Sequence, residues 1–247
     1  MKMNQMAFNQ LAQELKIPQR IVVLTGAGIS TASGIPDFRS SGGLFNQLSG
    51  QHYTGEEALS IKFLKENPKL FYQNFLDHIY YPDAQPNRAH DFLAKLEKNG
   101  HHIQIVTQNI DELHQKAGSS QVYEVHGSAM RFETMEGEPV DLKDVTQRDG
   151  LLVNRGEIVR PAITLYGEML DQQVLEAAVS AFLTADIMLV MGTSLKVYPV
   201  ASLPSYFTGR SSYLINRDPT PYDSLFTACF HENINTVVKA LEKQLEQ

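Results

Sequence analysis

The sequence predicts an α/β fold: a doubly wound, Rossmann-like parallel sheet with a smaller, discontinuous lobe. Two observations predict the sheet. Short runs rich in β-branched residues alternate with helical patterns, and these runs are apolar on both faces. A third observation predicts the lobe, because two long stretches interrupt the alternation. With 247 residues, of which 43% are hydrophobic, the chain is long enough for one large core and a satellite core.

Strands and helices are expected in alternation along the chain. Five segments are expected as parallel strands: residues 21–24, 103–107, 121–124, 187–191 and 212–215. Four segments have helical periodicity: residues 7–15, 87–99, 171–185 and 234–245. Each expected strand is followed by polar or glycine-rich residues. Because ligands of open parallel sheets bind beyond the carboxyl ends of the strands, we expect a site at that edge.

The two interrupting stretches differ in character. Residues 45–81 are helical and rich in aromatic side chains, whereas residues 128–160 are polar and irregular. We therefore expect residues 1–247 to form one domain with two lobes. The large lobe would comprise about 1–43, 87–128 and 161–247, and the small lobe about 44–86 and 129–160.

Composition excludes several classes of function. A net charge of −7 argues against non-specific nucleic-acid binding, which needs a basic surface. The single cysteine, Cys229, excludes an internal disulfide and any site that needs several thiolates. No stretch approaches the ~18 apolar residues of a membrane span, and no signal-peptide pattern begins the sequence. We expect a cytoplasmic protein that binds neither nucleic acid nor membrane; its oligomeric state stays open.

The first strand end reads "TGAGIS". Gly26 and Gly28 would let backbone N–H groups approach an anion closely, and the N-terminus of a following helix would add a favourable field. The spacing is not G-x-G-x-x-G, and the acidic residue usually found ~20 positions later is missing from a clear second strand. A purely structural glycine turn therefore stays an alternative for this motif.

Four more strand ends carry ligand-capable residues, each with a structural alternative. The segment "VTQNIDELH" holds Asn109 and Asp111, which could also cap a helix. His126 in "VYEVHG" stands alone, as structural histidines often do. The glycine and hydroxyl groups of "MGTSLKVYPV" could meet a phosphate or ribose, and Asn216 in "INRDPT" could bind ribose or begin a turn. Five such ends at one edge together favour a binding site.

Six motifs together resemble the sirtuin family of NAD-dependent protein deacylases: "GAGISTASGIPDFRS", "PNRAH", "TQNIDELHQKAG", "EVHGS", "GTSLKVYPVA" and "INRDPT". They follow the family's order over nearly the whole chain. The resemblance implies a single catalytic domain with a large dinucleotide-binding lobe, a small lobe and a cleft between them. It also implies NAD as the cofactor and an acyl-lysine of a protein or peptide as the partner, entering from opposite sides.

The resemblance implies an NAD site built from all five strand ends. The glycine turn would face the pyrophosphate, and a mobile loop that follows it would reach the ribose and nicotinamide. Asn109 and Asp111 resemble a nicotinamide-pocket pair, and the backbone at Cys229 and Phe230 would lie against adenine. The full set expected to bind NAD is Gly26, Ala27, Gly28, Ser30, Asp37, Phe38, Arg39, Gln108, Asn109, Ile110, Asp111, Gly192, Thr193, Ser194, Asn216, Arg217, Cys229 and Phe230.

The resemblance also assigns the chemistry. His126 resembles the catalytic base, and Asn109 is expected as the second catalytic residue. The acyl oxygen would attack the ribose carbon as nicotinamide leaves, giving an alkylamidate, and a ribose hydroxyl must then lose a proton. Imidazole, with an ordinary pKa of about 6.5, suits that proton transfer. The products would be free lysine, nicotinamide and an O-acyl-ADP-ribose.

One departure from the family concerns metal. Most sirtuins hold a structural zinc with two Cys-x-x-Cys pairs, and the matching positions here are Thr134, Gly137, Leu152 and Arg155. A zinc-free module and no metal ligand are therefore expected, and His101, His102 and Cys229 lie elsewhere without forming a zinc set. Packing is expected to replace the metal, with these candidates: Met130, Phe132, Leu142, Val145, Leu151, Leu152 and Val153.

Other departures concern the acyl peptide. The segment "RPAITLYGEML" keeps an extended apolar run that could pair with a peptide backbone. The residues expected to bind the substrate are Tyr166, Gly167, Glu168, Val197 and Tyr198. Phe75 and His78 occupy the positions where succinyl-preferring sirtuins carry Tyr and Arg, so we expect neutral acyl groups to be preferred.

Two rival functions are considered. A protein ADP-ribosyltransferase of the same fold would transfer ADP-ribose to protein, but it has no need of the base that His126 resembles. A non-catalytic NAD-binding module would have no need of Asn109, Asp111 and His126 together. Separate assays of nicotinamide, free lysine and ADP-ribosylated protein would discriminate the three.

Overall fold

A computed structural model describes residues 4–38, 42–49 and 52–247. Its larger sheet has six parallel strands in the order β11-β10-β9-β1-β2-β3. The strands are β1 (Arg20–Thr25), β2 (His102–Thr107), β3 (Val122–Glu124), β9 (Ile187–Met191), β10 (Ser211–Ile215) and β11 (Ala228–Phe230). Five of them confirm the strands expected from the sequence. The sixth, β11, is three residues long and was not expected, because so short a run shows no recognisable pattern of apolar residues.

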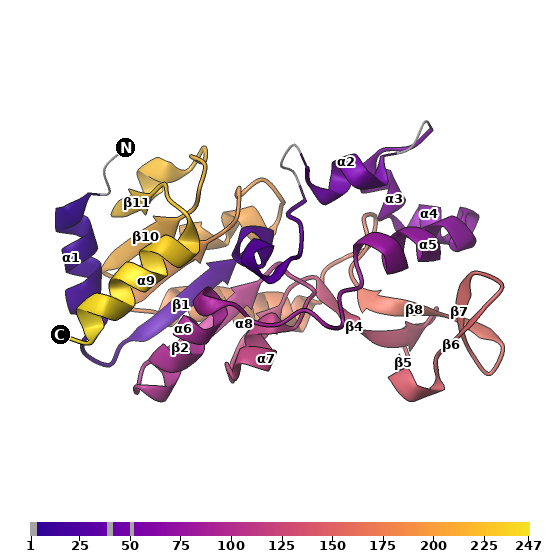
Figure 1. Ribbon diagram of the computed structural model, residues 1–247, viewed down its shortest axis with the longest axis horizontal. Coiled ribbons are helices and arrows are strands. Elements are labelled where there is room, and N and C mark those ends of the chain that lie inside the picture. Colours follow the sequence, from indigo (N-terminus) through magenta and orange to yellow (C-terminus); the bar gives the residue numbers. More distant parts are fainter. Residues whose placement is uncertain (1–3, 39–41, 50–51) are drawn as a thin grey trace.

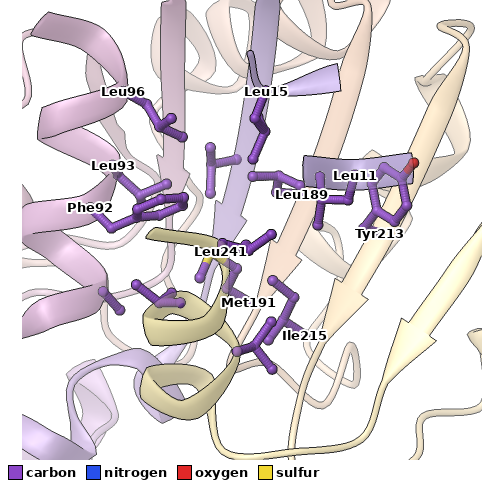
Figure 2. Packing of buried hydrophobic residues seen from close by; sticks show 14 of the residues in the cluster. Leu11, Leu15, Phe92, Leu93, Leu96, Leu189, Met191, Tyr213, Ile215 and Leu241 are labelled. Atoms are coloured by element: carbon purple, nitrogen blue, oxygen red, sulfur yellow. The ribbon is translucent and has the colours of Figure 1, made fainter. Parts of the chain in front are cut away.

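Helices cover both faces of this sheet, which confirms the doubly wound fold (Figure 1). On one face, α1 (Gln5–Glu14), α6 (Arg88–Lys98) and α9 (Ile234–Leu245) pack on alternate strand residues such as Ile21 and Val23. On the other face, α8 (Gln172–Thr184) and the 3-10 helix η4 (Val200–Tyr206) pack on Val22 and Leu24. Figure 2 shows the first of these cores, in which Leu241 approaches the strands from α9.

A second body lies at the other end of the molecule (Figure 1). It combines four helices, α2 (Leu44–Leu48), α3 (Gly55–Ala58), α4 (Ile61–Glu66) and α5 (Pro68–His78), with an antiparallel sheet in the order β5-β4-β8-β7-β6. The strands are β4 (Gly127–Thr134), β5 (Pro139–Val140), β6 (Thr146–Arg148), β7 (Leu151–Asn154) and β8 (Glu157–Ile163).

The expectation that residues 128–160 are irregular is wrong, because most of them form these strands. The strands are short, and β6 is exposed along its whole length, so the local sequence shows no apolar alternation. Pairing between strands far apart in the sequence, such as Thr134 with Val159, satisfies the backbone instead. The lobe boundaries stay a prediction, although Ile163 and Leu165 pack in the second core beyond the expected limit at 160.

The remaining helices are short. They are α7 (Leu113–Ala117) and four 3-10 turns: η1 (Ala27–Ile29), η2 (Thr31–Ser33), η3 (Leu142–Asp144) and η5 (Asp223–Leu225). None of the helices in the described ranges is both long and apolar enough to cross a bilayer.

Aromatic side chains from α5 form much of the second core. The rings of Phe75 and Phe132 meet edge to face at 6.2 Å, and the hydroxyl of the buried Tyr72 donates to the Val159 carbonyl. Of the residues expected to replace a metal, Phe132 and Leu152 are core residues, Met130, Val145 and Leu151 pack against them, and Val153 is buried. Leu142 is 51% exposed, so the expectation for this residue is wrong. It lies in the η3 turn, outside the paired strands.

Three of the four residues at the positions that match zinc ligands lie in or next to hairpin turns. The hydroxyl of Thr134 accepts from the N–H groups of Glu136 and Glu138, which closes the β4–β5 turn. Gly137 in that turn has a φ of +90°, a conformation that favours glycine. Arg155 occupies the turn between β7 and β8. Backbone hydrogen bonds and apolar contacts therefore hold these hairpins.

We expect the second body to stay folded without metal. After dialysis against a chelator, the free energy of unfolding should change by less than about 2 kcal/mol, whereas a structural zinc supplies ~10–16 kcal/mol to a small module. The measurement is thermal unfolding followed by circular dichroism, with metal content checked by elemental analysis. Cooperative loss of structure on chelation, restored by zinc and present also in a variant without the single cysteine (Cys229→Ser), would contradict this expectation.

Candidate active site

The strand order places β1 beside β9, where the direction of winding reverses. At this point the backbones that follow the two strands touch. The Gly26 N–H donates to the Met191 carbonyl at 3.1 Å, and the Gly28 N–H donates to the Gly192 carbonyl at 2.9 Å. A Cβ on Gly28 would lie 2.8 Å from Gly192 Cα, so a side chain at this position has no room. The glycine turn thus brings bare backbone to the crevice where dinucleotides bind in such sheets.

The segment after this turn differs from the expected helix. It continues as η1 and η2, two 3-10 turns of three residues each, and the expected helix N-terminus facing an anion is absent from residues 26–33. The small residues Ala27 and Ser33 give the segment no apolar stripe that could pack a longer helix on the sheet.

A cleft of about 720 Å³ opens at the carboxyl edge of the sheet and runs toward the second body. Its walls contain residues of both bodies, from Gly26 and Gly192 to Leu59 and Ile79. Most residues expected in the site line it: Gly26, Ala27, Gly28, Asp37, Phe38, Gln108, Asn109, Ile110, His126, Tyr166, Gly167, Glu168, Gly192, Thr193, Ser194, Val197, Tyr198, Asn216 and Arg217. Segments from opposite ends of the chain, from Gly26 to Ile234, therefore meet in one cavity.

Two expected residues support the cleft from behind its wall. The Ser30 hydroxyl donates to Asp111 Oδ2 at 2.6 Å and accepts from Asn109 Nδ2 at 3.0 Å. Asp111 Oδ1 accepts from the Leu113 N–H at 3.0 Å. Burial raises the pKa of Asp111, against the lowering effect of these hydrogen bonds. Ser30 and Asp111 thus fix the side chain of Asn109, which does line the cleft.

Two further residues of the expected cofactor set, Cys229 and Phe230, do not line the described part of the cleft. Phe230 is 2% exposed, and its ring packs on Phe8 and Tyr213 in the core, although its carbonyl accepts from the Asn216 N–H. Cys229 is half-buried on β11, the edge strand. Arg39 lies outside the described residues.

His126 is held by backbone on two sides. Its Nδ1 lies 3.0 Å from the Gln108 carbonyl, and its own carbonyl accepts from the Thr164 N–H at 3.0 Å. A carbonyl only accepts, so Nδ1 carries the proton and Nε2 keeps its lone pair. Burial lowers the pKa of His126 below the ordinary value, with the Gln108 contact opposing. The neutral form with a free Nε2 therefore prevails near neutral pH, as a base requires.

A buried polar cluster beneath the glycine turn was not expected from the sequence. The Thr25 hydroxyl donates to the Thr107 hydroxyl at 2.8 Å, and His114 Nε2 lies 3.0 Å from Thr25 Oγ1. The His114 ring meets that of His90 at 4.9 Å, and burial lowers the pKa of both, to about 4 for His90. Their positions in the motifs "PNRAH" and "DELH" were a signal, although local spacing does not place the two rings together.

Comparison with known proteins decides the family. Residues 26–199 match the model of the Sir2 family. The chain belongs to the Sir2 family. The resemblance drawn from the motifs is therefore confirmed.

Relatives and solved structures agree with this assignment. The chain is 43% identical over 228 residues to an NAD-dependent protein deacetylase of Staphylococcus aureus (strain COL), covering 90% of this chain and 92% of the relative. It is 41% identical to one from Clostridium perfringens, covering 93% and 96%. Among solved structures, Sir2 with a p53 peptide and NAD+ has a TM-score of 0.82 at 33% identity, covering 99% and 98%. Sir2 bound to an acetylated peptide has a TM-score of 0.80 at 32% identity, with the same coverage.

On the side of the second body, this Sir2-family chain surrounds the cleft with apolar residues such as Ile79 and Ile163. Tyr166 is 39% exposed, and its backbone already pairs with Leu59 and Ile61. Glu168 forms a two-pronged ion pair with Arg160, with one contact at 2.7 Å, in which Arg160 is only 5% exposed. Glu168 thus stabilises the strand end rather than presenting a free carboxylate, and Arg160 is a supporting residue that the sequence did not reveal.

Proposed function

We propose that this chain is an NAD-dependent protein-lysine deacetylase that releases free lysine and nicotinamide and forms O-acyl-ADP-ribose. The observation that carries the proposal is the position of His126. A neutral imidazole with a free Nε2 lines a cleft that begins at the glycine turn of the sheet. Membership of the Sir2 family and the deacetylase relatives support the same reaction.

The residues of the cleft fit NAD. Gly26, Gly28 and Gly192 leave a cradle without side chains, which suits a pyrophosphate. Thr193 lies beside them, and its hydroxyl accepts from Gln108 Nε2 at 3.0 Å and from the Leu195 N–H at 3.2 Å. Asn216 and Arg217 line the same cleft and would contact the adenosine half. When bound, NAD supplies the ribose that accepts the acyl group.

His126 would act as the base. Its Nε2 takes a proton from a ribose hydroxyl, while Nδ1–H stays on the Gln108 carbonyl and keeps the ring in one orientation. Asn109, fixed through Ser30, would orient the carboxamide end of the cofactor. Apolar residues at the far side of the cleft, such as Ile79 and Leu165, would exclude water from the acyl group.

The pH dependence of the reaction follows from the lowered pKa of His126. Because burial disfavours the charged imidazole, the base stays neutral at a lower pH than free imidazole would. We expect kcat/KM to fall with acid only below pH ~6.5, the ordinary value for histidine. The measurement is kcat/KM from about pH 4.5 to about pH 8, a range that spans the ordinary histidine pKa. The peptide should have no histidine and no free carboxylate. An acid limb centred above pH 6.5 would contradict the assignment.

Acyl preference follows from the charges of the cleft. The cationic side chains that line it in the described ranges are Lys196 and Arg217, both exposed, whereas Phe75 is buried in the second core and away from the lining. A succinyl carboxylate would enter the apolar end without a bidentate partner. We expect kcat/KM for an acetyl-lysine peptide to exceed that for the matched succinyl peptide by at least about tenfold. A higher value for the succinyl peptide would overturn this expectation.

One assay tests the function itself. The protein is incubated with NAD and an acetyl-lysine peptide, and nicotinamide, free lysine and ADP-ribosylated protein are measured separately. Equal amounts of nicotinamide and free lysine are expected, with no label transferred from NAD to protein. Nicotinamide release that accompanies protein labelling without free lysine would favour the ADP-ribosyltransferase.

We also propose that the protein is cytoplasmic. Fractionation of cells that express the chain would test this proposal.

A further inference from the structure

Three side chains with metal-binding atoms converge beside β11, the edge strand of the large sheet. They are Asp223, Cys229 and His231, and one ligand atom of each lies within 4.8 Å of the others. All three are half-buried. They do not line the cleft in the described part of the chain, and they belong to a different body from the hairpins that match the zinc module.

The fold explains why they meet. Cys229 lies on β11 and His231 follows two positions later, so an extended backbone directs both side chains to one face. Asp223 begins η5, the turn that precedes β11. The Cys229 thiol donates to the Asp223 carbonyl at 3.4 Å, and His231 Nε2 lies 2.8 Å from Asp223 Oδ2.

The carboxylate is oriented by a second layer. Asp223 Oδ1 accepts from the N–H and the hydroxyl of Thr220, at 2.8 and 2.7 Å, and Thr220 is buried. Partners of this kind fix ligating carboxylates in metal sites. His231 Nδ1 is buried without a hydrogen-bond partner in the described structure, so a single contact holds the imidazole. Thr220 occupies Oδ1 of Asp223, whereas Oδ2 and His231 Nε2 contact each other.

The ligand set is typical of zinc. Thiolate, imidazole and carboxylate bind Zn²⁺ at about 2.0–2.3 Å in a tetrahedron, which places ligand atoms about 3.3–3.8 Å apart. The observed limit of 4.8 Å requires only small side-chain rotations to reach that spacing. A set with sulfur and nitrogen disfavours magnesium and calcium, which take oxygen ligands.

A nucleophilic Cys-His-Asp arrangement is the competing interpretation of the same residues. An activated thiol needs a base within hydrogen-bonding reach. Here His231 faces the carboxylate through Nε2, at 2.8 Å from Asp223 Oδ2, and the Cys229 thiol donates to the Asp223 carbonyl instead. The nucleophilic interpretation is therefore disfavoured.

We propose that Asp223, Cys229 and His231 form a site for a zinc-class divalent cation, with water as the fourth ligand. Local spacing relates Cys229 to no zinc motif, and His101, which the sequence analysis left out of any zinc set, contacts Leu15 and Gln19. A bound ion would join the turn at η5 to the edge strand. Because Asn216 to Pro219 lead into that turn and line the cleft, the ion would lie behind the segment expected to meet adenosine.

Cobalt(II) titration into tag-free, chelator-treated protein tests the site. One equivalent should bind and give a sulfur-to-cobalt charge-transfer band together with the intense visible bands of four-coordinate cobalt. Because the chain has one cysteine, that band reports Cys229 alone. One equivalent of zinc should displace the cobalt and remove both signals.

Variants separate the site from unspecific binding. Cys229→Ser should lose the charge-transfer band, and His231→Gln and Asp223→Asn should weaken cobalt binding at least about tenfold. His102→Gln, at an exposed histidine on another strand, should bind as the parent does. Weak octahedral spectra without a charge-transfer band in the parent protein would overturn the proposal. So would affinity that is unchanged in His231→Gln and Asp223→Asn. The parent spectrum decides even if a variant fails to fold.

Discussion

Replacing His126 with alanine is expected to lower kcat for deacetylation by about 10²- to 10⁴-fold, the usual contribution of a positioned base. The substitution removes the only imidazole nitrogen that lines the described cleft. Affinity for NAD should change by less than about threefold, because the glycine cradle and Asn216 are untouched. A base stabilises the transition state and contributes little to ground-state binding of the cofactor. Lysine release from an acetyl peptide gives kcat, and calorimetry gives the dissociation constant for NAD.

A matched control uses His102→Ala, an exposed histidine at the start of β2, which should keep full activity. Circular dichroism should show that both variants are folded, since neither residue belongs to the hydrophobic cores. Turnover by His126→Ala within about threefold of the parent would refute the assignment of the base. A parallel loss of NAD affinity and turnover would place His126 among the binding residues instead.

Gly28→Ala is expected to cause the second large loss, this time in cofactor binding. The added Cβ would lie 2.8 Å from both Cα and the carbonyl oxygen of Gly192, and backbone cannot rotate away as a side chain can. The β1 and β9 turns must separate, which deforms the cradle. We expect KM for NAD to rise more than about tenfold and the free energy of unfolding to fall by about 1–3 kcal/mol, as for other overpacked sites.

Gly42→Ala is the matched control, because a Cβ at Gly42 meets no atom within 4 Å. Steady-state kinetics with varied NAD and fixed peptide measure the first effect, and chemical denaturation measures the second. An unchanged KM for NAD in a destabilised Gly28→Ala protein would show that the contact is structural only. The Gly42 variant should match the parent in both measurements.

The sequence by itself determined the parallel sheet and its ligand-binding edge. Each central strand is apolar on both faces, because helices cover both faces of the sheet. A continuous apolar run of this kind can be recognised from the local sequence alone. The polar ends of those strands were equally visible, and the motifs that hold them were long enough to indicate the family. Most of the cleft residues could therefore be named by position, His126 and Asn109 among them.

Only the tertiary structure decided the features that depend on pairs distant in the chain. The antiparallel sheet of residues 127–163 escaped prediction, because β6 is exposed along its whole length and β4 pairs with β8, a strand distant in the sequence. The ring contact of His90 with His114, the ion pair of Arg160 with Glu168, and the convergence of Asp223 with Cys229 also had no local signal. A side chain's pKa and its partners are set by what the fold packs around it, and spacing along the chain does not encode that geometry.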